Sequence, residues 1–212
     1  QLFMENGVDA KRLSIVNMIA DENRFINISP QKNGHPYFAY CGTISTYKDG
    51  VDILLKAFHT VIKRQSNVEL RIAGTFANEE DERTLRNLVT DLGISSNVLF
   101  IGIVSARDMP SFLAGAEAVV LSRPNNIQAK NGFPGKLGEY LLSKSPAIVT
   151  AVGDIPLFVK DGINGFVVEP NNEKAFAEKM IWIIDHPTEA KKIGEAGANL
   201  AHKEFNYLKE TK

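Results

Sequence analysis

Short apolar runs alternate with longer amphipathic segments from residue 37 to the end of the chain, and this alternation limits the fold more than any other feature. Six runs have the length and apolar content of buried strands, at residues 37–41, 68–73, 98–101, 118–122, 147–150 and 165–168. Continuous apolar strands separated by helices are typical of parallel sheets that helices cover on both faces. The sequence therefore predicts an α/β fold with a doubly wound sheet of six parallel strands in the order 3-2-1-4-5-6.

Helical segments are expected between and after these strands, at residues 50–64, 79–92, 105–116, from about 134, at 155–160, 173–185 and 188–205. The segment 50–64 carries an apolar stripe at helical spacing. Gly93 follows the segment 79–92 in the position that commonly ends a helix. Ser105 and Asp108 have the spacing of a capping box.

The strand order predicts where a ligand binds. In doubly wound sheets, ligands bind beyond the carboxyl ends of the strands at the point where the winding reverses. With the predicted order, this point lies between the first and the fourth strand. The loops that follow them, residues 42–49 and 123–135, also hold the most suggestive side chains in the chain.

Residues 123–142, which follow the fourth strand, contain three cations, with two glycines ahead of Lys136 and Pro134 at an expected helix start. The first amides of a helix and its positive dipole end form a ready anion site. Lys136 lies in the first turn, where a cation is unfavourable by roughly 0.3–1 kcal/mol unless an anion is present. This local conflict predicts a ligand that carries phosphate.

Composition limits the classes of function. The chain has 212 residues and a net charge of −1, so no broad basic surface for nucleic acid is expected. The one cysteine, Cys41, excludes an intrachain disulfide and lies in an apolar run, which indicates a buried structural thiol. No apolar run approaches the roughly 18 residues that span a bilayer. Residues 1–20 are expected to be the remnant of a preceding domain, and residues 21–212 one further domain.

Three side chains in or near these loops each have two interpretations. Lys48 supplies a point charge to a diphosphate, or is a solvated lysine in a turn. Glu139 accepts hydrogen bonds from a ribose diol, which we favour, or pairs with Lys136 three residues earlier. Arg123 contacts phosphate or caps a loop, and the sequence leaves both open. Gly42, Gly74 and Gly102 each follow a strand and permit close backbone approach.

Several other chemistries lack their motifs. A Gly-x-Gly-x-x-Gly turn is missing after the first strand, which argues against a nicotinamide or flavin enzyme. The Walker phosphate loop is absent, and the four histidines show no metal-ligand spacing. We therefore expect neither a metal nor a cofactor.

Together these motifs resemble the C-terminal, donor-binding domain of GT-B glycosyltransferases, in the large retaining family four known as "glycosyl transferases group 1". The resemblance runs from about Ile15 to Tyr207. Residues 15–25 resemble the interdomain crossing, 42–50 the first phosphate loop and 97–102 the third strand. Residues 131–139 occupy the place of the paired-glutamate motif, and 152–156 and 161–168 also match. The resemblance implies a Rossmann-like domain that binds a nucleotide-diphosphate sugar.

The resemblance also implies roles for individual residues. Lys48, Asn131 and Lys136 are the expected catalytic groups, with Lys48 on the donor diphosphate and Glu139 on the ribose hydroxyls. The remaining donor-binding residues are expected to be Gly42, Thr43, Gly74, Ile103, Val104, Arg123, Gly132, Phe133, Pro134, Gly135 and Leu137. Residues 132–135 would face the sugar and distal phosphate, and 103–105 the base. Two positions depart from the common pattern: Asn131 replaces the first glutamate of the pair, and Thr43 replaces an arginine.

The predicted function is transfer of a sugar from a UDP- or GDP-linked donor, with retention, to a glycan or lipid-linked acceptor held by a missing N-terminal domain. The isolated domain is expected to be inactive. A cytoplasmic location is expected, with peripheral attachment to the inner membrane face through the missing domain. A non-catalytic nucleotide-sugar-binding or scaffold subunit remains an alternative because of Asn131 and Thr43. A sugar-nucleotide epimerase and, more distantly, a nicotinamide-dependent dehydrogenase are further alternatives.

Overall fold

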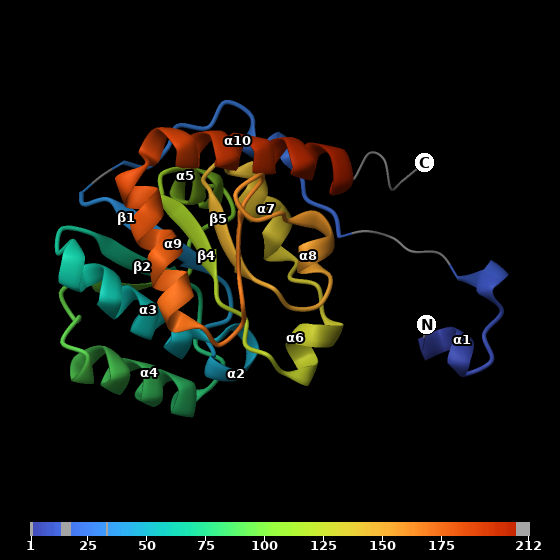
Figure 1. The fold of residues 1–212 in the computed structure, drawn as a ribbon, viewed down its shortest axis with the longest axis horizontal. Helices are drawn as coiled ribbons and strands as arrows, with labels where there is room; N and C mark the ends of the chain where they lie inside the picture. The colour runs from blue at the N-terminus through green and yellow to red at the C-terminus, as the bar shows by residue number, and fades with distance from the viewer. Residues whose placement is uncertain (1, 14–17, 33, 207–212) are drawn as a thin grey trace.

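A single parallel sheet organises the structure, a computed structural model that describes residues 2–13, 18–32 and 34–206. All five strand pairings are parallel, and the strand order is β3-β2-β1-β4-β5-β6. The strands are β1 (Tyr37–Cys41), β2 (Glu69–Ala73), β3 (Val98–Gly102), β4 (Ala118–Leu121), β5 (Ala147–Thr150) and β6 (Phe166–Val168). The predicted doubly wound order is confirmed (Figure 1).

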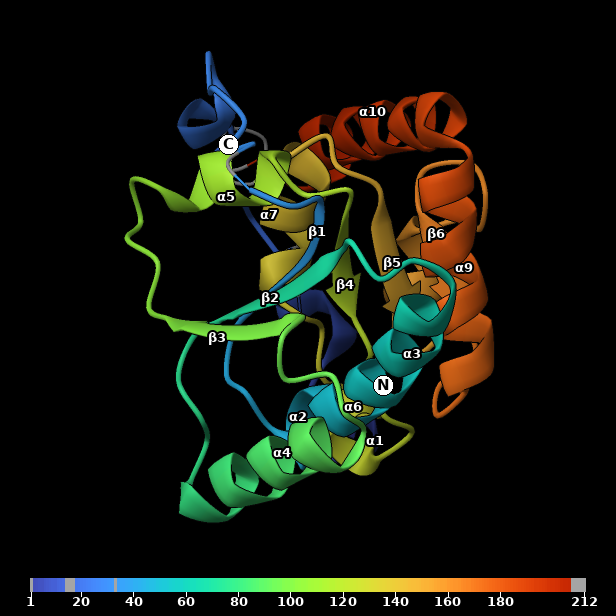
Figure 2. The same ribbon diagram turned by 90° about the vertical axis from the view of Figure 1, so that its left-hand side faces the viewer.

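Helices cover both faces of this sheet, as Figures 1 and 2 show. One face carries α3 (Val51–Arg64), α4 (Glu79–Asp91) and α9 (Glu173–Asp185), of which α3 and α9 pack against each other. The other face carries α5 (Met109–Ala114), α7 (Lys136–Leu142), α8 (Ile155–Phe158) and α10 (Pro187–Glu204), of which α7 and α10 pack together. The short helices α2 (Thr46–Asp49) and α6 (Ile127–Asn131) lie at one edge of the sheet.

The core follows the apolar patterns of the sequence. Every residue of β4 and β5 is buried, as expected for central strands with helices on both sides. The apolar stripe of α3 turns to the sheet, and Val51, Leu54 and Phe58 are fully buried. The periodicity of the sequence thus fixes which face of α3 packs and which face meets solvent.

Two helix starts differ from the prediction, and the loops 42–49 and 123–135 each contain a short helix, α2 and α6, that was not predicted. The segment 105–116 is helical only from Met109, because Ser105 and Asp108 form a turn in which the Ser105 hydroxyl accepts the Asp108 N–H at 3.1 Å. α7 begins at Lys136, two residues after the expected start at Pro134. The first turn of α6 is capped by the Asn126 side chain, which accepts the N–H of Ala129 at 2.8 Å.

The first twenty residues contain α1 (Leu2–Glu5) and the 3₁₀ helix η1 (Ala10–Arg12), which lie apart from the sheet in Figure 1. Residues 14–17 of the expected interdomain crossing are outside the described residues. The crossing rejoins the domain at Ala20, whose N–H donates to the carbonyl of Phe205 at 2.9 Å. The division of the chain at residue 20 stays a prediction. Among the described helices, none combines the length and apolar character needed to span a bilayer.

Candidate functional site

The loops that follow β1 and β4 touch each other at the carboxyl edge of the sheet. The Asn126 side chain donates a hydrogen bond to the carbonyl of Tyr47 in α2, over 2.5 Å. α2 and α6 accordingly lie at the same end of the molecule in Figure 1. The two segments that the sequence places at the reversal of winding are therefore neighbours in the fold.

Backbone hydrogen bonding continues past the strand ends and draws Gly42 and Gly74 together. Gly42 donates its N–H to Ala73 at 3.0 Å, and Gly74 donates to Gly102 at 2.7 Å. Both glycines have positive φ, 150° and 128°. A Cβ atom on Gly74 would lie 1.8 Å from the Gly42 carbonyl oxygen, so no other residue fits there without moving backbone. Glycine at position 74 is therefore required for these two turns to pack, and the approach of a ligand to Gly42 stays a prediction.

The Lys136 side chain runs beneath the Gly42 turn. A Cβ atom on Gly42 would lie 2.1 Å from the Lys136 Nζ atom, so the ammonium group fills the space that the missing side chain leaves. The ammonium also stands over the ring of Tyr40, 4.7 Å from its centroid. Burial lowers the pKa of Lys136, and the carboxylate of Asp49 opposes this shift. The Asp49 carboxylate, from α2, therefore supplies the anion that compensates Lys136 in the first turn of α7.

Asp49 was not singled out in the sequence, yet its carboxylate is the centre of the charge cluster. Its side chain is 2% exposed, and Oδ2 accepts hydrogen bonds from Lys136 Nζ at 2.5 Å and from the Tyr40 hydroxyl at 2.6 Å. Its Oδ1 lies 3.9 Å from Arg123 Nε. No periodicity marks this aspartate, because α2 ends there and α3 starts a new helical phase after Gly50.

Arg123 is buried and holds the loop after β4. Its guanidinium donates to the carbonyl of Gly132 at 2.5 Å and approaches that of Gln128 at 3.4 Å. Its Nε is buried without a hydrogen-bond partner among the described residues. Burial lowers the pKa of Arg123, and Asp49 again opposes the shift. These contacts show Arg123 in the second of its two predicted roles, the support of a loop. The loop that it supports is internal to the fold.

Lys48 lies in α2 next to Asp49 but, unlike Asp49, meets solvent. It is exposed, and its ammonium group has no hydrogen bond or ion pair with the described residues. It is near enough to Lys136 to lower the pKa of that lysine further. Two neighbouring ammonium groups, of which that of Lys48 is unpaired among the described residues, make a surface that favours an anion.

Glu139 pairs with Arg24 and not with Lys136. Arg24, from the 3₁₀ helix η2 (Glu22–Phe25), donates to the Glu139 carboxylate and, over 2.8 Å, to the carbonyl of Ala106. The alternative pairing with Lys136 is therefore wrong. The Glu139 side chain remains 28% exposed, so part of its carboxylate is accessible. Sequence reasoning missed Arg24, which lies 115 positions away and carries no motif.

The segment between α6 and α7 is held largely by its own contacts. Asn131 is exposed and its side chain donates to the Ile127 carbonyl at 2.9 Å. Phe133 packs against Phe158 and Phe205, with ring centroids 5.5 and 5.7 Å away. Pro134 and Leu137 are buried, and the Leu137 N–H donates to the Pro134 carbonyl at 3.0 Å. Besides the exposed Asn131, a ligand can reach the backbone at Gly135, which is exposed, and at Gly132, which is half-buried.

The residues expected near a base lie further along the same edge. Ile103 is 79% exposed and Val104 is half-buried, and both line a cavity of about 770 Å³ beside β3. Gly74 lines a second cavity of about 490 Å³ on the α4 side of β2 and β3. Thr43 is half-buried, and its carbonyl lies 2.6 Å from the Tyr40 hydroxyl, so its backbone joins the Asp49 cluster. Within the described residues, no three His, Cys, Asp or Glu side chains gather as around a metal ion.

The fold recurs in solved glycosyltransferases. Anabaena Alr3699/HepE, in complex with UDP and glucose, superposes with a TM-score of 0.85 at 19% identity, over 98% of this chain and 57% of that chain. The C-terminal domain of the glycosyl transferase group 1 family protein LpcC from Francisella tularensis superposes with a TM-score of 0.75 at 23% identity, over 89% and 99%. The sheet and its helices are thus those of the C-terminal half of GT-B enzymes.

Proteins of similar sequence lead to the same family. Trehalose synthase of Pyrococcus horikoshii is 25% identical over 207 residues, which is 95% of this chain and 46% of that protein. This chain thus spans about half the length of that curated relative. The model of the family "Glycosyl transferases group 1" matches residues 21–200. The chain therefore belongs to the group 1 family of glycosyltransferases.

Proposed function

We propose that residues 21–212 form the donor-binding domain of a retaining glycosyltransferase, and that residues 1–20 are the end of a preceding domain and its crossing. The donor is a nucleotide-diphosphate sugar, linked to UDP or GDP. The observation that carries this proposal is the excess of positive charge at the reversal of winding. Lys48, Lys136 and Arg123 are neighbours there of a single buried carboxylate, Asp49.

The diphosphate binds over the Gly42 turn, between Lys48 and Lys136. As the bond from the sugar to the diphosphate breaks, negative charge grows on the departing oxygen. Cations already in place stabilise this charge more than they stabilise the bound donor, which lowers the barrier. Arg123 acts through the loop that it holds, because its guanidinium is engaged with backbone carbonyls.

The remaining site residues surround the other parts of the donor. The backbone at Gly132 and Gly135, with the Asn131 amide, faces the sugar, while the packed side chains of Phe133, Pro134 and Leu137 fix that backbone. Glu139 accepts hydrogen bonds from the ribose with the carboxylate surface that Arg24 leaves accessible. The segment at Ile103 and Val104, which lines a cavity beside β3, receives the base, and Gly74 lines the neighbouring cavity on the α4 side.

The acceptor, a glycan or a lipid-linked sugar, binds to an N-terminal domain outside this chain. The enzyme works in the cytoplasm, with the N-terminal domain attached to the inner face of the membrane. The isolated domain therefore binds donor without transferring its sugar.

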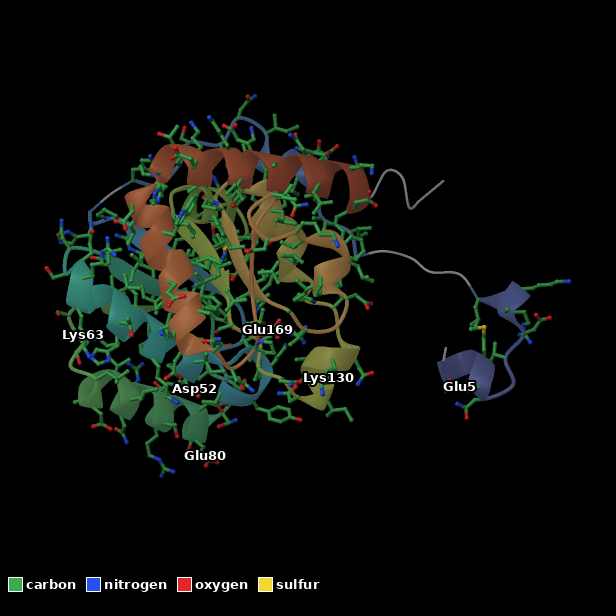
Figure 3. The ribbon with its side chains drawn as sticks, in the orientation of Figure 1. Glu5, Asp52, Lys63, Glu80, Lys130 and Glu169 are labelled. Carbon is green, nitrogen blue, oxygen red and sulfur yellow. The ribbon has the colours of Figure 1, made fainter. Side chains whose placement is uncertain are left out.

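Calorimetry with UDP-glucose and GDP-mannose tests donor binding in this chain. Lys48→Ala is expected to weaken binding of the preferred donor by roughly ten- to hundredfold, the worth of a hydrogen bond to a charged group. Lys63→Ala is the matched control, because Lys63 is exposed at the end of α3 remote from α2 (Figure 3). Equal affinities of Lys48→Ala and the unmodified chain would remove Lys48 from the site.

One specific observation favours a second function, that of a non-catalytic nucleotide-sugar-binding subunit. Asn131 carries no charge and its side chain bonds within its own helix. The full-length protein decides between the two: turnover that Glu139→Ala abolishes identifies an enzyme, whereas donor binding without turnover identifies a binding subunit. Release of free nucleotide without a glycosylated acceptor would instead indicate a sugar-nucleotide epimerase.

A further inference from the structure

The Asp49 carboxylate has more partners than its own helix requires. α2 is already capped at its start by the Ser45 hydroxyl, which accepts the Lys48 N–H at 3.2 Å. Asp49 sits at the other end, almost without solvent contact, and reaches Lys136 and Tyr40 from there. Burial of a carboxylate is unfavourable by several kcal/mol unless cations and hydrogen bonds compensate it. The position of this group therefore depends on the site and not on the helix.

Tyr40 links the same carboxylate to the phosphate loop. Its hydroxyl oxygen lies 2.6 Å from Asp49 Oδ2, 2.6 Å from the Thr43 carbonyl and 3.3 Å from Lys136 Nζ. A phenol has one proton, so it donates to either Asp49 or Thr43 while it accepts from Lys136. The cluster thus joins β1, α2 and α7 directly under the Gly42 turn.

We propose that Asp49 is a positioning residue of the diphosphate site, which holds the Lys136 ammonium beneath the Gly42 turn so that it faces a bound diphosphate. This inference rests on the proposed function. Asp49 itself does not touch the donor. It acts through Lys136, and through the turn that carries Lys48.

The backbone at Asp49 is held in place. Asp49 can therefore neither follow Lys136 toward a ligand nor be displaced by that ligand. The Asp49 carbonyl accepts the Ser122 hydroxyl at 3.1 Å, and the neighbouring Gly50 carbonyl accepts it at 2.9 Å. A Cβ atom on Gly50 would lie 2.4 Å from the Ser122 carbonyl, so this turn is closely packed on β4. The Lys136 side chain is 18% exposed, whereas that of Asp49 is 2% exposed. A ligand therefore reaches the ammonium from outside while the carboxylate holds it from inside.

The balance of charge leaves the site receptive to an anion. Asp49 contributes one negative charge against the cations Lys48, Lys136 and Arg123. The nearby Arg24–Glu139 pair adds no net charge. A carboxylate that merely neutralised the site would leave no excess, so the surplus of two positive charges indicates a second anion.

The pKa of Lys136 depends on this arrangement of charges, so a titration of Lys136 can test it. The groups that face it or its partners are Asp49 and Lys48 from α2, Tyr40 and Cys41 from β1, Arg123 after β4, and Glu139 and Tyr140 from α7. Burial lowers the pKa of Lys136 and Asp49 opposes this. Removal of the Asp49 charge must lower the pKa further, so the lysine loses its charge, and its hold on phosphate, at a lower pH.

The test compares Asp49→Asn with Asp52→Asn in this chain. Asp52 lies three residues along, is partly exposed and pairs weakly with Lys56 at 3.7 Å (Figure 3). The pKa of the Lys136 ammonium is measured by nitrogen NMR on labelled lysine, with the signal assigned by Lys136→Arg. Binding of uridine diphosphate and guanosine diphosphate is measured by calorimetry between pH 6.5 and pH 9. Asp49→Asn is expected to lower the pKa of Lys136 and to weaken diphosphate binding about tenfold at pH 7, with a larger loss at pH 9.

Other results would contradict either the positioning role of Asp49 or the proposed function. An unchanged Lys136 titration, or an affinity loss that is the same at every pH, would overturn the positioning role. If Asp49→Asn does not fold, the unmodified chain still decides: a Lys136 ammonium whose protons exchange as fast as those of Lys63 is not held, and the inference fails. If neither diphosphate binds the unmodified chain, the proposed function fails, and the Lys136 titration separately shows whether Asp49 holds that lysine.

Discussion

Two buried aspartates stand at the two ends of α2, and they are held in different ways. Asp81, from α4, is 7% exposed and accepts only uncharged donors: the Thr46 N–H at 2.9 Å, the Thr46 hydroxyl at 2.8 Å and the Asn78 amide at 3.1 Å. Asp49 is buried as deeply but is held by a lysine, a tyrosine and a nearby arginine. Both carboxylates fix the same short helix, and only one of them gathers cations.

This difference distinguishes a structural carboxylate, Asp81, from Asp49, which we propose to belong to the diphosphate site. Uncharged donors are sufficient to compensate Asp81, and they leave no charge for a ligand. The cations around Asp49 exceed what one carboxylate needs. A surplus of buried charge is unfavourable in the empty protein, and a bound anion would relieve it. The two ends of α2 should therefore respond differently to substitution.

The largest difference is expected in stability. Asp49→Ala leaves Lys136 and Arg123 buried without their counter-charge, which should lower the free energy of unfolding by about 3–5 kcal/mol. Asp81→Ala removes hydrogen bonds to uncharged groups and should lower it by only about 1–2 kcal/mol. Urea denaturation of both variants measures the two values. Equal losses would mean that the cations around Asp49 are solvated well enough to need no partner.

Of the two ends of α2, only the Asp49 end should respond to alkaline pH. Burial, and next the charge of Asp49, raise the pKa of Tyr40 well above its usual range. A raised pKa in the folded state means that stability is complete below about pH 10, where the unfolded tyrosine begins to ionise, and is lost above it. Unfolding free energy should therefore decline above pH 10, by about 1.4 kcal/mol per pH unit for each such tyrosine.

Tyr40→Phe is expected to reduce this alkaline slope by one proton, because the ionising hydroxyl is gone. Asp81→Ala should keep the slope of the unmodified chain, since no tyrosine contacts Asp81 among the hydrogen bonds of the described residues. Denaturation curves at pH 9, 10 and 11 supply the comparison. A slope that Tyr40→Phe leaves unchanged would assign the alkaline loss to Tyr37 and Tyr140, whose pKa values burial also raises.

The fold could be predicted because its determinants are local. The apolar runs give β1 and β5 with their bounds, and the stripe of α3 gives its buried face. Strand order followed from the alternation and from the rules of doubly wound sheets. The helix α6 was missed because it has only five residues, too few for a period to show, and because its Asn126 cap lies among turn-forming residues.

For the candidate site, the sequence predicted which two loops meet but not the contacts within them, because those contacts join residues far apart in the chain. Asp49 and Lys136 are 87 positions apart, and Arg24 and Glu139 are 115 apart. Lys136 drew attention as a misplaced cation, which was informative, but its partner could not be deduced from neighbours in the sequence. Nothing in the sequence marked Asp49, since its burial arises only when β1, β4 and α7 meet around it.

A smaller effect, on diphosphate affinity, is expected when Lys136 is displaced and Asp49 is left in place. Gly42→Ala puts a methyl group where the Lys136 ammonium now lies, 2.1 Å from its Nζ. Diphosphate affinity should fall about tenfold, because the flexible lysine can move but loses its place beneath the turn. Gly93→Ala is the control: it also has positive φ, at 67°, and its Cβ would meet no atom within 4 Å. Calorimetry with uridine diphosphate measures both variants, and an equal loss in the control would indicate general backbone strain.

The smallest effect is expected at the Asp81 end. Thr46→Val removes the hydroxyl that donates to Asp81 and keeps the Thr46 N–H that also donates to it. The free energy of unfolding should fall by about 1 kcal/mol, and diphosphate affinity should not change. Thr90→Val is the comparison, because it loses a hydroxyl that donates to the Arg86 carbonyl on the exposed side of α4. Its free energy of unfolding should fall by less than that of Thr46→Val. A drop in affinity for Thr46→Val would mean that α2 transmits strain from one aspartate to the other, so that the two ends form a single unit and Asp81 belongs to the site as well.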